Sequence, residues 1–169
     1  MSEPKYVDQG ATFSPDRVYR YRLWRVWNAD LPRVAFIMLN PSTADETKLD
    51  PTLRRCLGYA QRWSCGSFEI GNVYAYRSTD PSLLCQVTDP VGPENDQHLV
   101  QIAEVASFGV IAGWGADAER SRALGVLGLL RGHGHVFRLG RPTATGQPRH
   151  PLYMRGDLVP TLHATRAAR

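Results

Sequence analysis

Hydrophobic and polar side chains alternate from Val18 to Trp27, and several of these positions carry aromatic or β-branched residues. A period of two with these residue types is typical of a β-strand. Turn-forming residues 28–32 separate it from an apolar run, Arg33 to Leu39, which predicts a strand buried on both faces of a sheet. We expect these two strands to pair as a β-hairpin.

Helical and extended patterns alternate along the rest of the chain. Asp50 and Pro51 predict the start of a helix, because Asp is a frequent N-cap and proline suits the first helical position. Further helices are predicted over residues 94–106 and 119–130, and further strands over 67–74, 108–112 and 136–139. This order predicts an α/β protein: a three-layer α/β/α fold with a central, mostly parallel four-stranded sheet, preceded by the N-terminal β-hairpin.

The length of 169 residues corresponds to about one domain. Polar residues 1–16, which include Pro4, Gly10 and Pro15, are expected to form an N-terminal arm, and residues 17–169 a single α/β domain. No apolar run approaches the ~20 residues of a membrane-spanning helix, and no secretory signal follows Met1. We therefore expect a cytoplasmic protein without a membrane partner.

Arginine dominates the basic residues. The chain has 20 Lys and Arg residues, of which only Lys5 and Lys48 are lysine, and a net charge of +4. Arginine binds phosphates in a bidentate manner and stacks on bases, which favours a nucleic-acid partner. A gene rich in G and C would produce the same bias, so the composition leaves both explanations open. The sequence does not indicate an oligomeric state.

No cofactor or metal site is expected. Cys56, Cys65 and Cys85 form no C-x-x-C pair, and without a secretory signal they are expected to be reduced thiols. His133 and His135 lack the paired cysteines of a zinc site. The glycines around Trp114 could let a backbone approach a phosphate, but they do not form a dinucleotide-binding fingerprint.

Polar and aromatic residues follow each predicted core strand, where ligands of parallel sheets bind. Asparagine can read the edge of a pyrimidine, histidine can shuttle a proton or stabilise an oxyanion, and aspartate can hold a water. Each residue also has a local structural explanation, such as a turn, a cap or packing. The candidates are Asn40 and Asp45 after the first core strand, Asn72, Tyr76 and Arg77 after the second, Trp114 after the third, and Arg149, His150 and Arg155 after the last.

Three segments carry a resemblance to a known family. Residues 36–45 (FIMLNPSTAD), 71–81 (GNVYAYRSTDP) and 146–153 (GQPRHPLY) resemble domain of unknown function 1643, a bacterial and phage family, from about Tyr19 to Leu158. The chain is also distantly similar to the uracil-DNA glycosylase superfamily, which implies a uracil-DNA glycosylase-like version of the three-layer fold. There, the mismatch-specific branch has Gly-Ile-Asn-Pro-Gly where this chain has residues 38–42, and a motif beginning His-Pro-Ser matches residues 150–152. Met38, Ser42 and Leu152 depart from those motifs.

The second resemblance implies hydrolysis of the N-glycosidic bond of a flipped pyrimidine, modified or unmodified, with DNA favoured over RNA. Asn40, with Asp45, would position the water and His150 would stabilise the leaving base. Asn72 would read the base, and Trp114 or Tyr76 would stack on it. The phosphates would lie against Arg77, Arg149 and Arg155. Two alternatives remain open: a nucleic-acid or nucleotide binding module without catalysis, and an enzyme acting on a free modified nucleotide.

Overall fold

The computed structural model describes residues 3–42, 47–164 and 167. Its centre is a seven-stranded sheet in the order β1-β2-β4-β3-β5-β6-β7. The strands are β1 (Asp8–Phe13), β2 (Arg20–Val26), β3 (Arg33–Met38), β4 (Ser67–Asn72), β5 (Gly109–Ala112), β6 (Val136–Leu139) and β7 (Pro160–Ala164). The helices are α1 (Pro51–Arg62), α2 (Asn95–Val105) and α3 (Arg120–His133), with the short 3-10 helices η1 (Pro81–Gln86) and η2 (Pro151–Tyr153).

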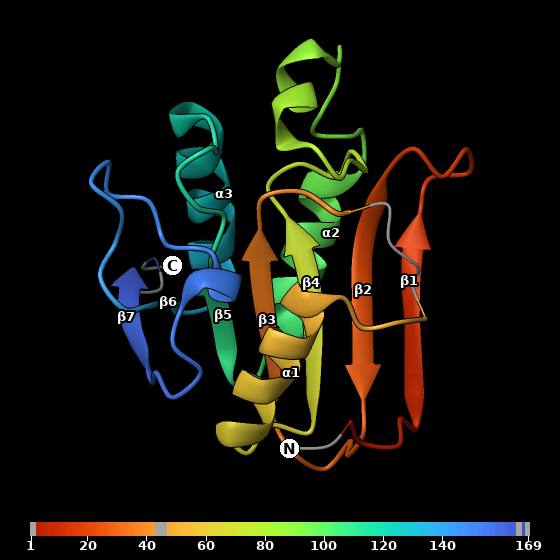
Figure 1. The fold of residues 1–169 in the computed structure, drawn as a ribbon, viewed down its shortest axis with the longest axis vertical. Helices are drawn as coiled ribbons and strands as arrows, with labels where there is room; N and C mark the ends of the chain where they lie inside the picture. The colour runs from red at the N-terminus through yellow and green to blue at the C-terminus, as the bar shows by residue number, and fades with distance from the viewer. Residues whose placement is uncertain (1–2, 43–46, 165–166, 168–169) are drawn as a thin grey trace.

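The α/β class is confirmed, and the three layers are visible in Figure 1. Alternate side chains of β3 point to opposite faces of the sheet, as the strand period requires. Phe36 packs in a core with Leu53 and Tyr59 of α1. Ile37 packs in the other core, together with side chains of α2 and α3. Helix α1 therefore covers one face of the sheet, and helices α2 and α3 cover the other.

The sheet is wider than predicted. The inner strands β4, β3, β5 and β6 are parallel to one another. Strands β1 and β2 add antiparallel pairs on one side, and β7 adds one on the other. The prediction of a four-stranded sheet is therefore wrong, because the sheet has seven strands. The sheet is also mixed, with parallel strands inside and antiparallel strands at both sides.

The prediction that β2 and β3 pair as a hairpin is wrong. Strand β2 pairs with β1 and β4, so β4 lies between β2 and β3. Residues 1–16, expected to be an arm, contain β1, whose Gly10 lies opposite Trp24. A Cβ on Gly10 would lie 2.5 Å from the Trp24 ring, so the glycine lets this ring cover the edge strand. The hairpin is therefore built from β1 and β2.

The chain reverses its direction of travel across the sheet after β4. From β3 it moves to β4 on one side, and it then returns past β3 to β5 on the other side. Because crossovers between parallel strands are right-handed, this reversal puts the connecting helices on opposite faces. The segments that follow β3 and β5 consequently lead toward opposite faces and leave a crevice at the strand ends, the topological switch point where α/β sheets bind ligands.

Candidate functional site

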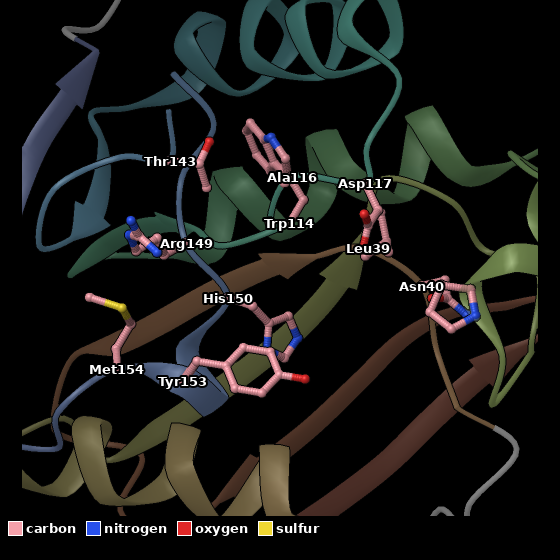
Figure 2. A pocket seen from close by; sticks show the side chains of 12 residues that line it. Leu39, Asn40, Trp114, Ala116, Asp117, Thr143, Arg149, His150, Tyr153 and Met154 are labelled. Atoms are coloured by element: carbon pink, nitrogen blue, oxygen red, sulfur yellow. The ribbon is translucent and has the colours of Figure 1, made fainter. Parts of the chain in front are cut away.

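A cavity of about 370 Å³ lies at this switch point. We call it the switch-point cavity; it is lined by residues 39–40 after β3, Pro81 of η1, residues 114–117 after β5, and residues 143, 149–150 and 153–154 near the end of the chain. Figure 2 shows the labelled side chains around it. Its size falls within the range of about 300–1,000 Å³ typical of small-molecule sites.

Glycines bring the last of these segments onto the end of β5. A Cβ on Gly113 would lie 2.8 Å from Cδ of Pro151, so only glycine lets the segment approach so closely. Gly115 has a φ of +78° and donates its N–H to the Pro148 carbonyl at 2.8 Å. These glycines seat the segment that carries His150, which is a different role from the phosphate approach considered from the sequence.

His150 is the N-cap of η2, and this fixes which of its nitrogens is available. The Leu152 N–H donates to Nδ1 of His150 at 3.3 Å. With Nδ1 acting as an acceptor, the neutral ring carries its hydrogen on Nε2. Burial lowers the pKa of His150, partly offset by the Asp50 carboxylate. The cavity therefore has a neutral imidazole whose Nε2–H can donate.

Asn40 is held in one orientation by the loop after β4. Its Nδ2 donates to the carbonyls of Ser78, at 2.8 Å, and Pro41, at 3.2 Å. With both donors committed to backbone, its Oδ1 is the atom left to accept a hydrogen bond from a water or a ligand. Asn40 thus offers an acceptor to the cavity that also holds the His150 donor.

The aromatic side chains of the cavity differ in exposure. Trp114 is only 2% exposed, and its Nε1 donates to Oε1 of Gln147 at 2.7 Å, so it forms a wall. Tyr153 is 82% exposed and its ring centroid lies 5.8 Å from that of His150. In Figure 2 the Tyr153 ring extends from η2 beside His150. The accessible aromatic face therefore belongs to Tyr153.

Arg149 and Asp117 supply the charges of the cavity. Nε of Arg149 donates to the Arg141 carbonyl at 3.1 Å, and its terminal nitrogens bond to none of the described residues. Asp117 is exposed and accepts a hydrogen bond from none of the described residues. The Arg149 guanidinium attracts anionic groups and the Asp117 carboxylate attracts cationic ones, so the two can orient a charged molecule in the cavity.

Four predicted site residues line the switch-point cavity: Asn40, Trp114, Arg149 and His150. Asn72 ends β4 at the same edge of the sheet, but its side chain is 2% exposed and does not line the cavity. Asn95 Nδ2 donates to the carbonyls of Asn72 and Val73, which secures this strand end. Asp45 lies outside the described residues.

The other three predicted residues lie away from the cavity. Tyr76 forms a bridge with Tyr19 beside β2, because the chain after β4 turns toward the β1–β2 hairpin. Arg77 donates to the Arg17 carbonyl and lies over the Phe13 ring. Arg155 is paired with Asp157, with Nη2 at 2.6 Å from Oδ2. The expected cluster of phosphate-binding arginines is therefore reduced to Arg149.

Asp117 and Tyr153 line the cavity but were not among the predicted site residues. Tyr153 belongs to the motif that includes His150, and Asp117 follows the glycines after β5. Membership of that motif was a signal for Tyr153, whereas the sequence holds none for Asp117, because Arg77 follows β4 at the same interval and lies away from the cavity. No group of His, Cys, Asp or Glu side chains within the described ranges is arranged to hold a metal ion.

The fold and the cavity together define an α/β protein with a polar cavity at the switch point of its sheet. The chain belongs to the family "Protein of unknown function (DUF1643)", whose model matches residues 20–152. No curated protein and no solved structure gave a significant match. Among the described helices, none has the length and apolar character needed to cross a bilayer.

Proposed function

We propose that the protein binds a pyrimidine nucleotide in the switch-point cavity and hydrolyses its N-glycosidic bond. The observation that carries this proposal is the pairing of a neutral imidazole donor, His150 Nε2–H, with the Asn40 Oδ1 acceptor in one cavity. The similarity of the Asn-Pro and His-Pro segments to the uracil-DNA glycosylase superfamily supports the same chemistry.

In the proposed reaction, a water oxygen forms a bond to C1′ of the sugar as the bond from C1′ to the base nitrogen breaks. The electron pair of the broken bond stays on the base, and the sugar passes through an oxocarbenium-like state. His150 donates a hydrogen bond to the O2 atom of the pyrimidine, where negative charge develops. Asn40 accepts a hydrogen bond from the water, whose proton leaves to solvent after attack, while the released base anion takes up a proton from solvent at the nitrogen of the broken bond. Asp45 would assist Asn40.

Charge favours a small substrate over a long duplex. Arg149 is the one guanidinium among the described residues lining the cavity, while Arg77 and Arg155 are engaged elsewhere. Duplex binding relies on several phosphate contacts, whereas a mononucleotide presents one phosphate group. This observation favours the second candidate, an enzyme acting on a free modified nucleotide, over a glycosylase that flips a base from DNA.

Release of free base from a panel of substrates tests the proposal. The panel contains uracil, thymine and 5-substituted pyrimidines as 2′-deoxynucleoside monophosphates, in single-stranded DNA, and in matched and mismatched duplexes, with release measured by chromatography. We expect release that the variant Asn40→Ala slows. Binding without release from any substrate would contradict hydrolysis and favour a binding module.

Tyr153 is expected to stack on the base in place of Trp114, because its ring is the exposed one. Stacking on an aromatic side chain is worth about 1–3 kcal/mol per base, so Tyr153→Ala should weaken nucleotide binding by about 5- to 150-fold. Tyr153→Phe keeps the ring and should bind almost as the wild type does. Titration calorimetry with dUMP measures the affinities of the two variants. As a control, ribose 5-phosphate lacks a base and should bind both variants equally. An equal loss for both ligands would contradict stacking.

A further inference from the structure

A second, larger cavity of about 830 Å³ adjoins the switch-point cavity. We call it the apolar recess; it is lined by Tyr74, residues 81–82, 84–85, 87 and 90–91, and residues 117, 119 and 122. Pro81 and Asp117 line both cavities. The two cavities are therefore adjacent, with Pro81 of η1 and Asp117 after β5 at their junction.

Apolar side chains form most of the wall of this recess. They come from η1 and the loop after it and from the end of β4: Tyr74, Pro81, Leu84, Val87, Pro90 and Val91. Such a surface favours the binding of an alkyl group, because each methylene that it removes from water tightens binding.

The charged groups of the recess, apart from Asp117, are already engaged within the protein. Arg122 donates through Nε and Nη2 to the Val73 carbonyl, and its Nη2 lies 2.6 Å from Oδ1 of Asp96. The Glu119 carboxylate caps α3 by accepting the N–H groups of Ser121 and Arg122. Neither residue is free to attract a phosphate, so the recess suits an apolar group.

Asp117 stands at the junction of the two cavities. It is exposed, and no donor among the described residues bonds to its carboxylate. Figure 2 shows its side chain on the inner side of the segment after β5, on the same side as Asn40. A carboxylate here repels an anionic group passing through the junction and attracts a cationic one.

We propose that the two cavities form one bipartite site, in which the apolar recess binds an uncharged or cationic substituent on C5 of the pyrimidine. This rests on the proposed function, because His150 then holds O2 of the base. In a pyrimidine ring C5 lies directly across from C2, so a substituent on C5 extends away from His150. The substrate class is a 5-substituted pyrimidine nucleotide with a short aliphatic arm.

Binding of four probes to the full-length chain tests this inference: dUMP, 5-propynyl-dUMP, 5-(3-aminoallyl)-dUMP and 5-(2-carboxyvinyl)-dUMP. We expect the propynyl and aminoallyl probes to bind about tenfold more tightly than dUMP, because two or three carbons enter the recess. The carboxyvinyl probe should bind less tightly than the propynyl probe. Asp117→Asn should remove this dependence on the charge of the arm, measured as the ratio of the affinities for the propynyl and carboxyvinyl probes.

Alkylation of Cys85 is a second way to test the recess, because an alkyl group on this side chain would occupy it. It lines the recess and is exposed, whereas Cys56 and Cys65 are buried. Burial raises the pKa of both buried thiols, that of Cys65 to about 11, so N-ethylmaleimide should react selectively at Cys85. Alkylation should abolish the tighter binding of the propynyl probe and leave dUMP binding unchanged. Cys85→Ser, treated in the same way, should keep the tighter binding.

Chromatography of the same samples separates this inference from the proposed function. Tighter binding of the propynyl probe without release of free base would support the bipartite site and contradict hydrolysis. Base release with equal affinities for dUMP and the propynyl probe would overturn the bipartite site and leave hydrolysis standing. Tighter binding that survives alkylation of Cys85, or no binding of any probe, would also overturn it.

Discussion

His150→Asn is expected to slow base release by about 10²- to 10³-fold, the effect of removing one donor from a developing oxyanion. Asparagine is chosen because it is a good N-cap and can accept the Leu152 N–H as the imidazole does. The start of η2 should therefore persist while the Nε2–H is lost. Single-turnover rates with saturating protein measure the effect, and His150→Ala, which removes both functions, should also lower stability.

The pH profile gives this prediction a second readout. Burial lowers the pKa of His150 from its ordinary value of 6.5, so the ring stays neutral in the folded protein somewhat below that pH. Protonation would put a hydrogen on Nδ1, where the Leu152 N–H already points, and break the cap. We expect base release to decline only below about pH 6.5. A decline centred well above this pH would contradict a neutral His150.

The same shift affects stability. The unfolded chain binds the His150 proton more readily than the folded chain, because the pKa of the folded state is the lower one. Stability therefore falls as the pH drops through 6.5 toward the folded pKa. His150→Asn should remove this part of the pH dependence of the free energy of unfolding.

Glu69→Ala is expected to lower the free energy of unfolding by about 3–5 kcal/mol, the usual effect of breaking a buried ion pair. Glu69 lies on β4, and its side chain is fully buried. Its Oε1 accepts from Nε of Arg22 at 2.6 Å, and its Oε2 accepts from Nη1 of Arg33 at 3.1 Å. Removing the carboxylate leaves two guanidinium groups, each largely withdrawn from water, without their shared partner.

Urea denaturation measures this change. Glu69→Gln keeps the volume and one acceptor and should lose less stability than Glu69→Ala. Asp157→Ala breaks an exposed pair with Arg155 and is the matched control, with no measurable change expected. A loss no greater than that of the control would show that the three charged groups contribute little to stability.

Two inner strands were predictable because they are apolar: the runs after Arg33 and Phe108 became β3 and β5, which are buried on both faces of the sheet. Strand β4 (SFEIGN) is also buried throughout, although half of its residues are polar. Strands β1 and β7 have the sequences DQGATF and PTLHA, which lack a hydrophobic pattern. Their extended form depends on hydrogen bonds to a neighbouring strand, and such edge strands leave little trace in a sequence.

The site was predictable only where side chains directly follow a core strand or lie in the His-Pro segment. Asn40 and Trp114 belong to the first group and His150 to the second. Tyr76 and Arg77 follow β4 by a few residues, and there the chain has already turned toward the β1–β2 hairpin. Tertiary hydrogen bonds set the direction of that turn, so local sequence does not reveal it.

The seating of residues 148–151 on the end of β5 has a consequence for the order in which the protein matures during synthesis. The contacts of Gly113 with Pro151 and of Gly115 with Pro148 join segments far apart in the chain. A nascent chain that has released β1 to β5 from the ribosome can already form most of its parallel sheet. It lacks His150 and Tyr153 until residues 148–153 have also emerged, so the wall of the switch-point cavity is completed only after the strands that flank it have been made.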